Sequence, residues 1–227
     1  MVDEGNAFSD ENLRRKKQRT PTVLILDTSS SMCNNMMDGT GTERIDYLNE
    51  GLEYFQEEIS NKGHTEKRID VSIVTFGGSA KVKHEFTQFE NWTPPNLYAS
   101  GTTPMADAIE KAIDRVRGVK DHYQDEAINY SRPFIWLLSD GRPDMDKGSD
   151  RWNAVQKQLE VGTEENRFRF HAIGIGNEAV SKLNQLVEPT GFEATKMKPG
   201  KFEEYFEFVS NSLDADEYAD RSGFDQI

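Results

Sequence analysis

The 227-residue chain has 40 acidic against 27 basic side chains, and its formal charge of −13 disfavours binding to the phosphate backbone of nucleic acid. Apolar residues make up 35% of the chain, yet no apolar stretch approaches the roughly 20 residues that cross a bilayer. The single cysteine, Cys33, excludes an internal disulfide and a multi-cysteine metal site. The first residues lack the apolar centre of a secretion signal, so we expect a cytoplasmic protein without a membrane span.

The first half of the chain alternates apolar strands with amphipathic helices. A short β-branched apolar run predicts a central strand covered on both faces, and apolar residues at spacings of three and four predict a helix that ends at Gly63. Two later strands form a predicted hairpin, and Pro104 occupies the first position of another helix. In chain order the segments are a flexible lead-in 1–20, strand 22–26, helix 43–63, strands 68–78 and 80–92, and helix 104–119.

The second half repeats the pattern of an apolar strand followed by polar residues and a helix. Its segments are a strand within 133–143 that ends in Ser139 and Asp140, helix 151–165, strand 168–176, helix 178–187, an extended piece 192–197, helix 201–213 and an acidic tail 214–227. This order predicts an α/β domain over 21–213. We expect a doubly wound, mostly parallel central sheet of about six strands, with one antiparallel edge strand and helices on both faces.

Oxygen-bearing side chains follow two of the predicted strands and precede one helix. Asp27, Ser29 and Ser31 come after the first strand, Asp140 ends the strand that begins near residue 133, and Thr103 directly precedes a helix. The carboxyl ends of neighbouring parallel strands meet at one edge of a sheet, so these five side chains are expected to converge there. Carboxylate and hydroxyl oxygens are ligands that hard cations such as Mg²⁺ prefer.

Three motifs resemble those of von Willebrand factor A domains. They are "DTSSS" at 27–31, which looks like the DxSxS motif, "GTTPM" at 101–105, which resembles the threonine loop, and "LLSDGRP" at 137–143, which resembles the aspartate loop. The resemblance covers roughly residues 21–213 and implies a Rossmann-like fold. The chain is also similar to small bacterial stand-alone members of this family, including those associated with tellurite resistance.

The resemblance implies a metal-ion-dependent adhesion site. In such a site Ser29 and Ser31 would bind the cation directly, Thr103 directly or through water, and Asp27 and Asp140 mainly through water or hydrogen bonds. The implied cation is Mg²⁺, with Mn²⁺ or Ca²⁺ as alternatives. The pair of threonines leaves open whether Thr102 or Thr103 faces the metal, and Thr103 is preferred because it precedes the proline.

A cation whose closest ligands are neutral hydroxyls keeps much of its charge. A Glu or Asp of a partner protein could then complete its coordination, which predicts a protein-interaction module without catalytic activity. One alternative is a Mg²⁺-dependent phosphatase of the haloacid-dehalogenase type with Asp27 as nucleophile. That chemistry normally needs a second aspartate two residues later, where this chain has Ser29. Another alternative is a non-catalytic scaffold with a structural metal.

Simpler explanations exist for each segment taken alone. The hydroxyls after the first strand could cap backbone groups, and Asp140 could be only a turn residue. His171 lies in an apolar strand and is expected to be structural.

Overall fold

The computed structural model describes residues 18–35, 39–141, 143–198 and 200–219. The strands of this part of the chain are β1 (Thr20–Asp27), β2 (Ile69–Gly77), β3 (Ser79–Gln88), β4 (Phe134–Ser139), β5 (Arg169–Ile175) and β6 (Thr195–Met197). The α-helices are α2 (Arg44–Asn61), α3 (Gly63–Glu66), α4 (Met105–Asp125), α5 (Asp150–Glu164), α6 (Asn177–Val187) and α7 (Phe202–Ala219). Short 3₁₀ helices span Ser30–Cys33 (η1), Phe89–Asn91 (η2) and Glu188–Thr190 (η3).

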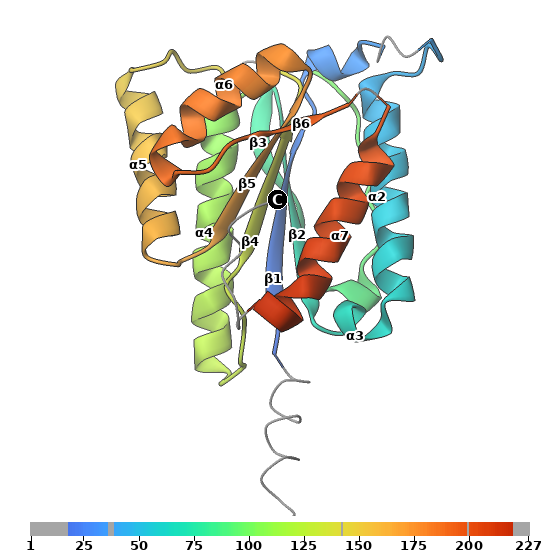
Figure 1. Cartoon of the computed structure of the whole chain (residues 1–227), viewed down its shortest axis with the longest axis vertical. Helices are drawn as coiled ribbons and strands as arrows, with labels where there is room; N and C mark the ends of the chain where they lie inside the picture. The colour runs from blue at the N-terminus through green and yellow to red at the C-terminus, as the bar shows by residue number, and fades with distance from the viewer. Residues whose placement is uncertain (1–17, 36–38, 142, 199, 220–227) are drawn as a thin grey trace, which may run out of the picture.

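The strands form one sheet of six strands in the order β3-β2-β1-β4-β5-β6. Every neighbouring pair is parallel except β2 and β3, which form the predicted antiparallel hairpin at the edge. The predicted fold class is therefore confirmed. In Figure 1, α4 and α5 lie to the left of the sheet and α2 and α7 to its right. The carboxyl ends of β1 and β4 both face the upper edge of that view.

Strand β1 is the centre of two hydrophobic cores, one on each face of the sheet. Val23 and Ile25 pack in the core beneath α4, α5 and α6, whereas Leu24 and Leu26 pack beneath α2 and α7. All four side chains are fully buried. A strand covered on both faces has no polar face, and this explains why its sequence is a continuous apolar run rather than an alternating one.

The lead-in is shorter than predicted, because Arg19 and Thr20 are part of the fold. The Nε atom of Arg19 donates a hydrogen bond of 2.8 Å to Asp70 Oδ2, and the hydroxyl of Tyr123 donates to the same carboxylate. This cluster attaches the start of β1 to β2 and α4. The remainder of the expected flexible lead-in, residues 1–17, lies outside the described residues.

Helix ends also differ from the predictions. Helix α2 ends at Asn61, and Gly63, which was expected to end it, begins α3. Helix α4 continues to Asp125, because Tyr123 extends its buried stripe beyond the predicted end at Val119. Helix α7 continues to Ala219, six residues into the segment 214–227 that we expected to be a tail. The rest of that segment, 220–227, lies outside the described residues.

The imidazole of His171 packs on the sheet face that α7 also covers. Its ring centroid lies 4.2 Å from that of Trp136 in a stacked arrangement, and it also stacks on Phe134. The pKa of His171 is lowered to about 4, mainly by burial and in smaller part by the nearby guanidinium groups of Arg169 and Arg132. His171 therefore packs as a neutral aromatic ring in the folded protein.

Candidate metal centre

Asp27 is the last residue of β1 and is fully buried. Its Oδ1 atom accepts a hydrogen bond of 2.9 Å from the backbone N–H of Ser29. Its Oδ2 atom accepts one of 2.5 Å from the hydroxyl of Ser139, the last residue of β4. The carboxylate of Asp27 thus joins the carboxyl ends of the two central strands, and it fixes the first turn of the loop that carries both serines.

The two serine hydroxyls connect this loop to the loop after β4. The Oγ atoms of Ser29 and Ser31 are 3.0 Å apart, and Ser31 Oγ donates a hydrogen bond of 2.6 Å to Asp140 Oδ1. Ser29 is buried and Ser31 is half-buried at the rim. Four of the five predicted site residues therefore form one connected group, as convergence at the sheet edge predicts.

Backbone hydrogen bonds hold the threonine loop against the loops after β1 and β2. The N–H of Ser30 donates to the carbonyl of Gly101 at 3.0 Å, and that of Ser100 donates to Thr28 at 2.7 Å. The N–H of Gly78 donates to the carbonyl of Thr102 at 2.9 Å. The position of this loop therefore follows from main-chain pairing with its neighbours.

Gly101 is required at this crossing for two reasons. Its φ of +74° lies in the left-handed region, and an added Cβ would lie 2.5 Å from the Cα of Gly78. A side chain at residue 101 would push the threonine loop away from the strand ends.

Thr103 lies next to Asp27 and the aspartate loop. A Cβ added to Gly141 would lie 3.6 Å from Asp27 Oδ2 and 3.7 Å from Thr103 Oγ1, so both oxygens face the same small space beside that glycine. Thr103 is half-buried, whereas the side chain of Thr102 is exposed. This arrangement favours Thr103 over Thr102 as the residue that faces the site.

The site brings two carboxylates together in a poorly solvated position. The net effect of the surroundings raises the pKa of Asp27 to about 6. Burial raises it most, hydrogen bonds from Ser139 and Ser29 lower it, and the charge of Asp140 raises it. The side chain of Asp140 is fully buried and forms an ion pair with Arg44, the first residue of α2. A cation between these carboxylates would relieve their mutual repulsion.

Sequence reasoning missed Ser139 and Arg44. The sequence could have indicated Ser139, because a serine directly before Asp140 at the end of a strand can reach the neighbouring strand. No local pattern indicated Arg44, because it is separated from Asp140 by 96 positions.

The side chains at the site offer only oxygen donors apart from Arg44, and three of the five proposed ligands are neutral hydroxyls. Within the described ranges, no group of three or more His, Cys, Asp or Glu is placed to hold a metal ion. The mixture of hydroxyls with two buried carboxylates fits a hard divalent cation that keeps several waters, as Mg²⁺ does.

Comparisons with known proteins agree with this architecture. The family model described as von Willebrand factor type A domain matches residues 22–218. No curated protein matches the chain. Among solved structures, the PilB minor pilin from Streptococcus sanguinis is 17% identical with a TM-score of 0.61, over 91% of this chain and 64% of that chain.

Two further solved structures share the fold. The vWF domain of the type V pili tip protein Mfa5 from Porphyromonas gingivalis is 10% identical with a TM-score of 0.58, over 92% of this chain and 99% of that chain. The manganese-loaded TRAP protein of Plasmodium vivax is 17% identical with a TM-score of 0.54, over 87% of this chain and 74% of that chain. At these identities the likeness shows the fold alone.

Proposed function

The chain belongs to the von Willebrand factor type A domain family, and we propose that it is a metal-dependent protein-binding module. Ser29, Ser31 and Thr103 would hold a divalent cation, with Asp27 and Asp140 acting through water or hydrogen bonds. Mg²⁺ is the preferred ion, and Mn²⁺ or Ca²⁺ are alternatives. The solved TRAP structure is manganese-loaded, which supports a divalent cation as the ion that this fold binds.

The observation that carries this proposal is the hydrogen-bonded series from Ser29 through Ser31 to Asp140. It places neutral hydroxyls from one loop against a carboxylate from another, and no turn-capping role requires that contact. A bound cation would supply a positive charge that neutral ligands leave largely uncompensated. The protein's part is to hold the hydroxyls in place and to exclude water from Asp27.

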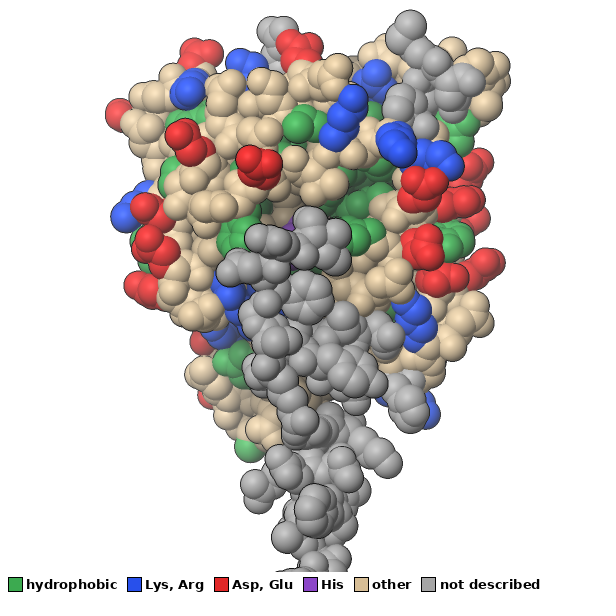
Figure 2. Space-filling view, viewed as in Figure 1, with side chains coloured by type: hydrophobic (Ala, Val, Ile, Leu, Met, Phe, Trp, Pro, Cys, Tyr) green, Lys and Arg blue, Asp and Glu red, His purple; other side chains and the backbone are tan. Residues whose placement is uncertain are grey.

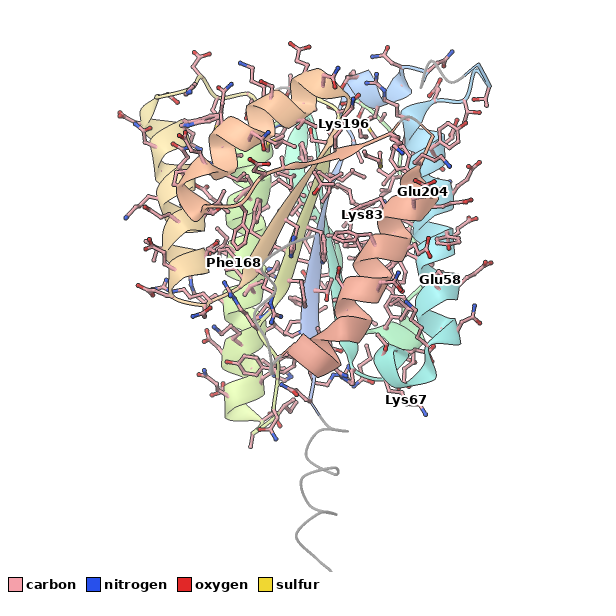
Figure 3. All side chains as sticks on the ribbon, viewed as in Figure 1. Glu58, Lys67, Lys83, Phe168, Lys196 and Glu204 are labelled. Atoms are coloured by element: carbon pink, nitrogen blue, oxygen red, sulfur yellow. The ribbon has the colours of Figure 1, made fainter. Side chains whose placement is uncertain are left out.

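The partner we propose is a protein that presents a Glu or Asp side chain to the cation. The surface of this chain repels carboxylates, and Figure 2 shows acidic side chains gathered over α2 at the right of the view. Glu58 on α2 and Glu204 on α7 are labelled in Figure 3. With a formal charge of −13, the protein needs a bridging cation to hold an acidic partner.

Binding is favoured over phosphatase chemistry by the state of Asp27. Both of its carboxylate oxygens accept hydrogen bonds, one from the N–H of Ser29 and one from Ser139. A nucleophilic aspartate needs a free oxygen that faces the substrate, and the residue two positions later would have to be a general acid rather than Ser29. We therefore propose a non-catalytic module.

Partner capture with and without chelator tests this function. Partners eluted by EDTA from immobilised protein in Mg²⁺ buffer should no longer bind the Ser31→Ala and Asp140→Asn variants. Ser60→Ala, which removes a hydroxyl from the exposed face of α2, is the matched control and should bind normally. Partner capture that is unchanged by EDTA and by both site substitutions would contradict the proposal.

Two other outcomes separate the alternatives. Hydrolysis of a generic phosphate ester that disappears in Asp27→Asn would support the phosphatase. Metal binding without any metal-dependent partner would support the scaffold with a structural metal.

No helix in the described part of the chain is long and apolar enough to cross a membrane. The cytoplasmic location and the similarity to tellurite-resistance-associated members stay predictions. PilB extends well beyond the region matched here, so nothing about its assembly is transferred to this chain.

A further inference from the structure

Arg44 already neutralises a carboxylate of the proposed metal centre. Its guanidinium donates through Nη1 to Asp140 Oδ2, while Asp140 Oδ1 accepts the hydroxyl of Ser31 at 2.6 Å. Both oxygens of Asp140 are therefore engaged, one by a proposed metal ligand and one by an internal cation. The Asp140 side chain is fully buried, and 22% of the Arg44 side chain is exposed.

Apart from this ion pair, the surroundings of Arg44 are unfavourable for a cation. Arg44 is the first residue of α2, where the positive end of the helix dipole repels positive charge. Its Nε atom is buried without a hydrogen-bond partner among the described residues. A buried donor without an acceptor destabilises the folded state, because the group has lost its water and gained nothing in return. The ion pair with Asp140 therefore holds the guanidinium of Arg44 in its partly buried position.

We propose that Arg44 is a displaceable counter-ion, which pairs with Asp140 when no metal is bound and leaves that carboxylate when a divalent cation binds. The inference rests on the proposed function, since it concerns the same site. A divalent ion attracts Asp140 more strongly than a single guanidinium charge does, and it repels Arg44. Once released, the Nε–H regains hydrogen bonds to water.

This arrangement gives Arg44 two opposite effects. In the metal-free protein it stabilises the fold, because it prevents Asp140 from being an uncompensated buried charge. In the metal-bound protein the same ion pair has been broken, and its loss reduces the net affinity for the metal. Arg44 thus sets the concentration of divalent cation at which the binding surface forms.

Calorimetric titration of the full chain with MgCl₂ and with MnCl₂ tests the inference. Arg44→Gln should bind both ions about tenfold more tightly than the wild type, a typical size for coupling between two binding events. Arg117→Gln is the matched control, because it removes an exposed arginine from an ion pair with Asp114 on α4. Its metal affinity should equal that of the wild type.

Thermal unfolding supplies a second measurement. In chelator, Arg44→Gln should melt at a lower temperature than the wild type, and saturating Mg²⁺ should raise its melting temperature by a larger increment. Arg44→Lys retains the positive charge but lacks the planar guanidinium group. Its metal affinity should lie between those of the wild type and Arg44→Gln. Equal or weaker metal affinity of Arg44→Gln would overturn the inference.

If Arg44→Gln does not fold in chelator, a measurement on the wild-type protein tests the displacement of Arg44. The Nε–H signal of Arg44 in the nuclear magnetic resonance spectrum should exchange slowly with solvent in EDTA and rapidly in saturating Mg²⁺. Slow exchange under both conditions would overturn the displacement.

Failure of the metal centre is distinguishable from failure of the Arg44 inference. If Ser31→Ala weakens metal binding while Arg44→Gln matches the wild type, only the role of Arg44 is overturned. If the wild type and Arg44→Gln bind neither ion, the proposed metal centre itself is wrong.

Discussion

The hydroxyl of Ser31 donates a hydrogen bond of 2.6 Å to Asp140, although the two residues are 109 positions apart in the sequence. This contact joins the loop after β1 to the loop after β4. It exists because the two strands are parallel neighbours in the sheet and end at the same edge.

Substitution Ser31→Ala should weaken divalent metal binding without unfolding the protein. Ser31 is half-buried at the rim, so loss of its hydroxyl leaves no large cavity, but it removes both a proposed ligand and the donor to Asp140. We expect a loss of at least about tenfold in Mg²⁺ affinity by calorimetry. An unchanged affinity would show that the hydroxyl does not bind the ion.

Substitution Asp27→Asn should separate metal binding from stability. The buried carboxylate is costly to keep charged. An asparagine can still accept from the N–H of Ser29 while its amide donates to the hydroxyl of Ser139, so this neutral isostere should leave the metal-free protein at pH 7 about as stable as the wild type. Metal affinity should nevertheless fall, because one of two negative charges at the site is lost. Urea unfolding in EDTA and calorimetric titration measure the two effects. Marked destabilisation in EDTA would contradict this account.

His171 should make the free energy of unfolding depend on pH in acid. Its folded pKa of about 4 is below the ordinary value of 6.5, so the unfolded chain binds more protons between these values. The stabilisation is complete above pH 6.5 and is lost as the pH falls towards 4.

The variant His171→Phe keeps an aromatic ring beside Trp136 and cannot be protonated. Between pH 7.5 and 4.5 in EDTA, the free energy of unfolding of the wild type should fall by roughly 2–3 kcal/mol more than that of this variant. Urea unfolding at each pH measures the difference, and parallel pH profiles for the two proteins would refute the prediction.

Substitution Gly101→Ala should disturb the site through the backbone. The positive φ and the short distance to Gly78 predict a destabilisation of about 1–3 kcal/mol and weaker metal binding, because the threonine loop must move. Gly118→Ala in α4 is the control, since an added Cβ there meets nothing within 4 Å. That change should be neutral or stabilising by up to about 1 kcal/mol. Equal effects of the two substitutions on metal affinity would contradict the proposed role of the loop.

Most of the architecture could be predicted from local sequence patterns. The apolar run in β1 indicated a strand buried on both faces, and the alternation of strands and helices predicted the parallel sheet. Helix ends were less predictable, since α4 continues to Asp125 because Tyr123, beyond the predicted end, occupies a buried position. The end of a helix depends on what its last turn packs against, which a local window does not contain.

The candidate site also has features that could be predicted from the sequence and features that could not. The sequence by itself determined which oxygen-bearing residues end the strands, because the apolar runs and the polar residues that follow them are adjacent in the chain. Only the tertiary structure decided that Ser139 binds Asp27 and that Arg44 pairs with Asp140. These contacts join segments about 100 residues apart, so they depend on how the loops pack at the sheet edge rather than on any local periodicity.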